Sequence, residues 1–191
     1  IEVPSVDLAL ELPDGWVAVD LTHPDLRAAL EQMGREGEWF GIQLEHGVGD
    51  GIESAAEDDE TIAIWAWDGG HGSAWPEHCT VSVKPPEWDS IAQRVDAITD
   101  YIAQEHRGDL DASTLVPLPA GDASRFDYRW SDTSGGSDFV FLERSQQQTL
   151  ACSDQALGDL GDVSAKHDRW LAMAESLQFL TPPGEVVAAR R

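Results

Sequence analysis

The stretch DFVFLERSQQQTLACS, residues 138–153, contains two predicted strands, and the other predicted elements are described relative to them. Phe139 to Glu143 and Gln148 to Cys152 are short runs of apolar and aromatic residues with polar residues on both sides, which is typical of strands. The polar segment 144–147 between them is a natural hairpin turn. The stretch therefore predicts an antiparallel strand pair.

Two more strands are predicted directly upstream of this pair. One is Thr114 to Leu118, and the other is the run around 126–130, in which aromatic residues alternate with charged ones. We expect Gly135 and Gly136 to form the turn that leads into the opening stretch, because glycine pairs often mark turns.

The N-terminal half repeats this period-two pattern. Strands are predicted at 61–67 and 79–84, on the two sides of a glycine-rich loop. The first residues predict a strand over 6–12, a tight turn at LPDGW (12–16) and a second strand over 16–21.

Apolar residues spaced three and four apart predict helices between and after these strands. The predicted helices run from Pro24 to Met33, over 38–60, from Trp88 to Ile102 after Pro85-Pro86, and from about Ser164 through Leu177, ending before Pro182. Because strands and helices do not strictly alternate, the predicted class is α+β, an antiparallel sheet of about six to eight strands covered by helices. We expect one domain over 1–184, with 22–60 as a helical insertion and 185–191 as a tail.

The charge of the chain excludes several partners. Thirty-six acidic residues against twelve basic ones give a formal net charge of −24. Nucleic acid and anionic membranes are disfavoured, because affinity for phosphate comes from lysine and arginine. The acidity has two kinds of interpretation: a strongly solvated surface, which acid-rich coding or adaptation to a salty cytoplasm would produce, or a surface that attracts a basic protein partner. The simpler one is solvation.

Location is left open by the sequence. No apolar run approaches the length that spans a bilayer, and no charged start followed by a hydrophobic stretch resembles a signal peptide. We expect a cytoplasmic protein, or an extracytoplasmic one if a leader preceded Ile1. Cys79 and Cys152 could form a disulfide in an oxidising compartment, and the sequence does not decide whether they are bonded.

Several motifs together resemble the PsbP-like α/β/α sandwich. They are the LPDGW turn, the strands DFVFLER and QQTLACS, and the closing helix DRWLAMAESLQFL (168–180). The family includes photosystem extrinsic subunits, a nuclear-transport Ran-binding factor and many bacterial proteins. PDLRAALEQM (24–33) is similar to an extra helix of actinobacterial members. The resemblance implies a binding or assembly protein without a catalytic centre, and it carries over no catalytic residue.

The sequence contains no complete catalytic motif. The sequence lacks a G-x-S-x-G elbow, an H-E-x-x-H helix, a phosphate-binding loop and a dinucleotide fingerprint. Cys152 with His167 as its base is the remaining nucleophile pair, but a thiol in a strand is usually buried and inert. We therefore predict no enzyme and no cofactor.

The loop stretch WAWDGGHGSAWPEHC, residues 65–79, offers His71, His78 and Cys79 as metal ligands. In an extended chain His78 and Cys79 point to opposite faces, and a structural zinc ion normally takes four ligands. We therefore predict no metal. Trp75, beside Pro76, either folds back over the sheet edge, which is the favoured interpretation, or stays exposed to a partner. His71, Trp75 and His78 are the candidate partner contacts.

Two functions follow from these observations. The favoured one is a non-enzymatic interaction domain with an acidic surface, such as an adaptor, an assembly factor or an immunity-type protein that binds a basic partner. The alternative is a metal-binding or metal-dependent protein that uses the 71–79 loop. The oligomeric state is not predicted.

Overall fold

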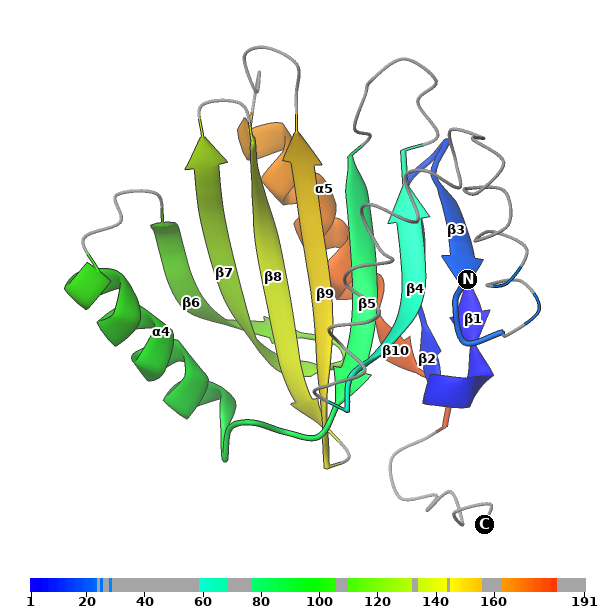
Figure 1. The fold of residues 1–191 in the computed structure, drawn as a ribbon, viewed down its shortest axis with the longest axis horizontal. Helices are drawn as coiled ribbons and strands as arrows, with labels where there is room; N and C mark the ends of the chain where they lie inside the picture. Colours follow the sequence, from blue (N-terminus) through cyan, green and yellow to red (C-terminus); the bar gives the residue numbers. More distant parts are fainter. Residues whose placement is uncertain are drawn as a thin grey trace.

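The structure is a computed structural model of the 191-residue chain. It describes residues 1–23, 25, 28, 59–68, 77–105, 110–131, 134–143, 145–155 and 163–181. Among these residues the strands form a seven-stranded sheet and a three-stranded sheet, accompanied by helices α4 and α5 (Figure 1).

The seven-stranded sheet is antiparallel throughout, with the strand order β3-β4-β5-β9-β8-β7-β6. Its strands are β3 (Val17–Asp20), β4 (Thr61–Trp67), β5 (His78–Lys84), β6 (Leu110–Leu118), β7 (Gly121–Ser131), β8 (Ser134–Glu143) and β9 (Gln146–Gln155). Each of these strands was predicted from the sequence, and β6 to β9 are longer than predicted. The opening stretch is confirmed as the β8–β9 pair.

The turn predicted at Gly135 and Gly136 is wrong. Both glycines lie inside β8, where Gly136 pairs with Tyr128 on one side and Ser153 on the other. A Cβ atom on Gly136 would lie 2.3 Å from the carbonyl oxygen of Cys152 and 2.6 Å from the Tyr128 hydroxyl. Glycine stands here because a neighbouring backbone and an aromatic ring approach too closely for a side chain.

The predicted turn at LPDGW is present, since the Trp16 amide donates to the Pro13 carbonyl at 3.1 Å and Gly15 has a φ of +83°. The strands on its two sides belong to different sheets. β2 (Leu8–Ala9) pairs with β1 (Glu2–Val3) and β10 (Gln178–Phe179), with the 3-10 turn η1 (Pro4–Val6) between β1 and β2. The turn therefore carries the chain from the small sheet to β3.

The two predicted helices after Pro85-Pro86 and after Ser164 are α4 (Ile91–Glu105) and α5 (Val163–Ser176). The last helix ends one residue before Leu177, which the pattern included. There the Leu177 amide donates to Ala174 and the Ser176 hydroxyl donates to the Met173 carbonyl at 2.7 Å. The chain then enters β10, a strand that the sequence pattern did not predict, because two residues are too short to show a period.

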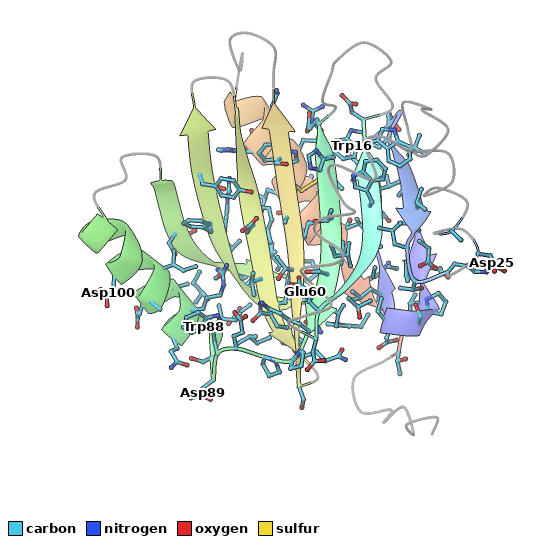
Figure 2. The ribbon with its side chains drawn as sticks, viewed as in Figure 1. Trp16, Asp25, Glu60, Trp88, Asp89 and Asp100 are labelled. Atoms are coloured by element: carbon cyan, nitrogen blue, oxygen red, sulfur yellow. A yellow bond between two sulfur atoms is a disulfide. The ribbon has the colours of Figure 1, made fainter. Side chains whose placement is uncertain are left out.

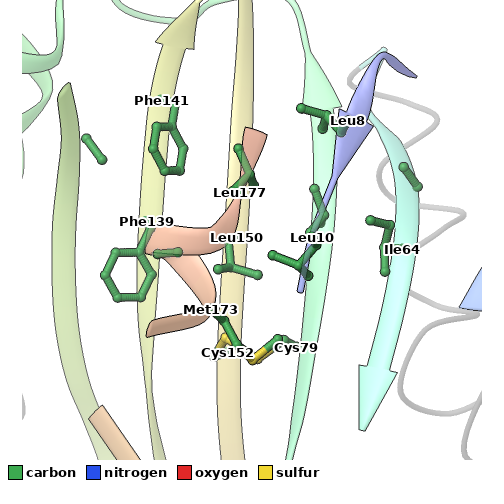
Figure 3. Packing of buried hydrophobic residues seen from close by; sticks show 14 of the residues in the cluster. Leu8, Leu10, Ile64, Cys79, Phe139, Phe141, Leu150, Cys152, Met173 and Leu177 are labelled. Carbon is green, nitrogen blue, oxygen red and sulfur yellow. A yellow bond between two sulfur atoms is a disulfide. The ribbon is translucent and has the colours of Figure 1, made fainter. Parts of the chain in front are cut away.

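Helix α5 packs on one face of the large sheet and seals the hydrophobic core. Its inner residues Trp170, Met173 and Ala174 are at most 2% exposed. Figure 3 shows how the side chains of β8, β9 and β5 meet this helix, with residues of the small sheet closing the far side. The labelled core residues are Leu8, Leu10, Ile64, Cys79, Phe139, Phe141, Leu150, Cys152, Met173 and Leu177.

Helix α4 packs on the opposite face, against β6, β7 and β8. Its residues Ile91 and Arg94 are buried, while Asp96 and Asp100 are exposed. Asp100 lies on the outer side of the helix (Figure 2). A helix on each face of an antiparallel sheet confirms the predicted α+β class and the α/β/α layering.

Two of the predicted segments fall mainly outside the described residues. Of the predicted insertion 22–60, the structure describes residues 22, 23, 25, 28, 59 and 60. The predicted tail 185–191 lies outside the described residues. Within the part of the chain that is described, no helix is long and apolar enough to cross a membrane.

Candidate contact site at the β4–β5 loop

The predicted contact residues belong to the connection between β4 and β5. His71 and Trp75 lie in the segment 69–76, outside the described residues, whereas His78 is the first residue of β5. The described residues on the two sides of the segment are joined, since the Asp68 amide donates to the Glu77 carbonyl at 3.1 Å. The two ends of the connection therefore lie next to each other, where β4 ends and β5 begins.

Glu77 joins this position to α5. Its carboxylate is buried, at 6% exposure, and its Oε1 accepts a hydrogen bond from Trp170 Nε1 at 2.8 Å. Arg169 Nε lies 3.5 Å from the same oxygen. Burial raises the pKa of Glu77, and the Arg169 charge and the Trp170 hydrogen bond oppose that rise. The carboxylate thus ties the loop to the last helix.

His78 joins the same position to β9. Its Nε2 lies 3.1 Å from the Ser153 hydroxyl, and the two residues are direct partners in the β5–β9 ladder. On its other side His78 pairs with Trp67, whose ring stacks against that of Trp65 with the ring centres 4.9 Å apart. The imidazole is half-buried at the start of β5, a central strand of the sheet.

Cys79 is covalently bonded to β9. It forms a disulfide with Cys152, its direct partner in the ladder, at a Cα–Cα distance of 4.0 Å. Both residues are buried, and Cys79 Sγ lies 3.7 Å from Met173 Sδ. The question that the sequence left open is therefore answered by the fold, which places the two cysteines opposite each other.

The disulfide bears on both reactive roles considered for these cysteines. A cysteine binds a metal ion or acts as a nucleophile in its thiolate form, and a sulfur in a disulfide is not a thiolate. Cys152 is thus not a nucleophile that His167 could activate as a base. The centre of the His167 ring lies 5.4 Å from that of Trp170. Cys79 is likewise unavailable to the metal set proposed with His71 and His78. Within the described residues, no group of three or more His, Cys, Asp and Glu side chains is placed to hold a metal ion.

The C-terminal end of the β4–β5 loop is firmly attached to its neighbours. Three consecutive residues, Glu77, His78 and Cys79, attach the end of the loop to α5 and β9 by a buried hydrogen bond, a ring contact and a covalent bond. These contacts hold Asp68 and Glu77, the described residues on the two sides of the segment, in one place. We name Glu77, His78, Cys79 and Asp68 the loop base.

A second polar cluster, which the sequence did not predict, lies between α4 and the sheet. Arg94 of α4 donates from Nη1 to the Ser124 hydroxyl. The Tyr128 hydroxyl lies 3.5 Å from Asp138 Oδ1, and the Arg94 charge acts on the same carboxylate. Arg94 is only 8% exposed, so the helix inserts a charge where its pattern predicts an apolar side chain.

Burial dominates the electrostatics of this second cluster. Removal from water raises the pKa of Asp138 to about 6, although the Arg94 charge and the Tyr128 hydrogen bond favour the ionised form. Burial also lowers the pKa of Arg94 and raises that of Tyr128. A single signal in the sequence pointed here, namely an arginine within the apolar face of the predicted helix.

The comparisons with known proteins concern the fold. No protein-family model matches the chain, and no curated protein matches it. Among solved structures, the solution structure of cyanobacterial PsbP (CyanoP) from Synechocystis sp. PCC 6803 is similar, with a TM-score of 0.51 and 10% sequence identity. The match covers 94% of this chain and 90% of that one.

Proposed function

The chain has the PsbP-like fold, and from this premise we propose that it is a non-enzymatic interaction domain that binds a basic protein partner. The acidic surface attracts the partner, and the β4–β5 loop with His71, Trp75 and His78 forms the specific contact. Its role is that of an adaptor, an assembly factor or an immunity-type protein.

One observation carries the electrostatic part of this proposal. Each basic side chain that the structure describes is already engaged within the molecule: Lys84 with Glu87, Arg94 with Ser124 and Asp138, Arg125 with Asp127, and Arg169 and Lys166 with Glu77. Carboxylates elsewhere, such as those labelled Asp89 and Asp100 in Figure 2, are exposed. A basic surface is the complement of this pattern.

The loop base supports the specific part. A long-range field selects the sign of a partner and its association rate, whereas specificity needs a fixed contact of defined shape. The disulfide and the Glu77–Trp170 hydrogen bond supply a fixed base beside a tryptophan and a histidine, residue types that are common in binding contacts.

The disulfide also favours an oxidising compartment over the cytoplasm that the sequence led us to expect. Disulfides persist in secreted and periplasmic proteins and are rare in a reducing cytosol. We therefore propose that the partner is met in an oxidising compartment.

The test is affinity capture followed by calorimetry. The oxidised protein captures partners from its native source at low salt, and each captured protein is purified and titrated against the wild type and against Trp75→Ala and His71→Ala. We expect a basic protein whose affinity falls with added salt and falls at least tenfold in the Trp75→Ala variant. The control is His23→Ala, which removes an exposed histidine of another segment.

Two results would count against the proposal. One is the absence of any captured protein that binds in the purified titration. The other is a bound protein whose affinity changes neither with salt nor with the loop variants.

A further inference from the structure

We propose that the outer edge of β6 is a strand-addition site for an extended, basic segment of a partner protein. The proposal deepens the function proposed above and rests on it. β6 is the last strand of the large sheet, at the side where α4 packs (Figure 1). In the part of the chain that the structure describes, β6 pairs only with β7, so its other edge has no strand partner there.

The composition of β6 is unusual for an edge strand. After Asp111, the run from Ala112 to Leu118 (ASTLVPL) contains no charged residue, in a chain in which 25% of residues are charged. Leu115, in the middle of this run, is 51% exposed. Natural edge strands are normally protected from pairing by charged side chains or proline, and the part of β6 from Ala112 to Val116 has neither.

Pro117 indicates which backbone groups face outward. Proline has no amide hydrogen, so within a sheet it fits an edge strand with its nitrogen directed away from the neighbouring strand. Pro117 is paired with Asp122 of β7. Because backbone groups alternate sides along an antiparallel strand, the N–H and C=O groups of Ser113 and Leu115 share the outward direction. These groups are positioned to pair with an incoming strand.

Pro117 also limits the length of the site. It offers an outward carbonyl but no donor, so regular pairing stops beside it. An incoming strand is therefore aligned on Ser113 and Leu115, and an apolar side chain next to Leu115 covers the exposed part of that leucine.

The charges around β6 identify the occupant. Asp122, next to the end of β6, is exposed, as are Asp96 and Asp100 on α4, which packs against β6. A segment that alternates an apolar residue with lysine or arginine is complementary in charge to Asp122 and to the net charge of −24 of the chain. A second copy of this chain would bring the same carboxylates together and add a net charge of −24, which disfavours self-pairing.

The experiment uses nine-residue peptides displayed on phage and selected against the oxidised full chain. Selected peptides are synthesised, and their dissociation constants are measured by fluorescence anisotropy with the wild type, Leu115→Pro, Leu115→Ala and Thr114→Ala. Leu115→Pro removes an outward donor without removing a bond to β7, so we expect at least a tenfold loss of affinity. Leu115→Ala keeps the donor and loses only apolar contact, so we expect a smaller loss. Thr114→Ala is the control with unchanged affinity.

Hydrogen exchange gives a second readout specific to strand addition. We expect bound peptide to slow exchange at the Ser113 and Leu115 amides, and the selected peptides to alternate apolar and basic residues. The proposal is overturned if no peptide is selected, if Leu115→Pro binds as tightly as the wild type, or if sedimentation shows a wild-type dimer that Leu115→Pro abolishes.

The edge site and the loop contact can be disproved independently of each other. If a captured basic partner binds Leu115→Pro as tightly as the wild type, only the proposed edge site is disproved. If peptides slow exchange in β6 but no partner loses affinity in Trp75→Ala, only the proposed loop contact is disproved.

Discussion

The two faces of β8 and β9 differ in the chemistry of their side chains, which are apolar on one face and include charged groups on the other. On the α5 face, Phe139, Phe141 and Leu150 are fully buried in a continuous apolar cluster. On the α4 face, the neighbouring Asp138 lies in a cluster that also contains Arg94. The α5 face is thus stabilised by apolar burial and the disulfide, whereas the α4 face balances buried charges. One sheet can therefore have a face that fixes the fold and a face whose stability responds to pH.

The largest effect that we expect on the α5 side comes from removal of the disulfide. The bond joins residues separated by 73 positions. Cys79→Ala with Cys152→Ala is expected to lower the free energy of unfolding by about 4 kcal/mol, because the unfolded chain is no longer restrained. Urea denaturation followed by tryptophan fluorescence measures it. As a control, a reducing agent destabilises the wild type and leaves the double variant unchanged. A loss below about 1 kcal/mol would contradict this interpretation.

Adjacent residues of β9 compare the two faces directly. Leu150 is fully buried on the α5 face, and Thr149 is half-buried on the other. We expect Leu150→Ala to lower the free energy of unfolding by about 3 kcal/mol, because a cavity remains in the apolar cluster, and Thr149→Ala by less than about 1 kcal/mol. Equal losses in urea denaturation would remove the distinction between the faces.

Arg94 tests whether the α4 face depends on charge balance. Arg94→Met keeps much of the packing and leaves Asp138 buried without the opposing positive charge. At pH 8 we expect a loss of about 2 kcal/mol, most of which is absent when Asp138→Asn is already present. A double-mutant cycle in urea measures this coupling. Additive losses would show that the two side chains do not depend on each other.

The smallest expected effect is the pH dependence due to Asp138. Burial raises its pKa from 3.8 to about 6, so the folded protein binds this proton more tightly than the unfolded chain does. Its contribution to the free energy of unfolding is therefore highest at low pH and is lost as pH rises from about 4 to above 6. Between pH 5 and 8 we expect Asp138→Asn to remove on the order of 1 kcal/mol of this dependence.

The measurement is the difference between wild-type and Asp138→Asn urea curves across that pH range. The difference cancels the general repulsion of the acidic chain, which both proteins share. Glu77→Gln is a second comparison, since burial also raises the pKa of Glu77 and its contribution has the same sign. Parallel curves for the wild type and Asp138→Asn would show that Asp138 does not titrate in this range.

The strands of the large sheet could be predicted because their side chains alternate between two environments. The period-two pattern at Thr61 to Trp67 needed no knowledge of distant residues. Gly136 could not be understood in this way, since its reason is the approach of Tyr128 and of the Cys152 backbone from neighbouring strands. The loop base was predicted only in part, because the bond of Glu77 to Trp170 joins positions 93 residues apart.

The long strands of the large sheet, helices α4 and α5, the α+β class and the acidic character could be read from the sequence, because they depend on local periodicity and on composition. Which of these elements meet depends on the tertiary structure. It placed Cys79 opposite Cys152, buried Arg94 near Asp138, and left the uncharged run of β6 at the edge of the sheet. These pairings are set by strand order and register, which arise from contacts between residues far apart in the chain and leave no periodic pattern in it.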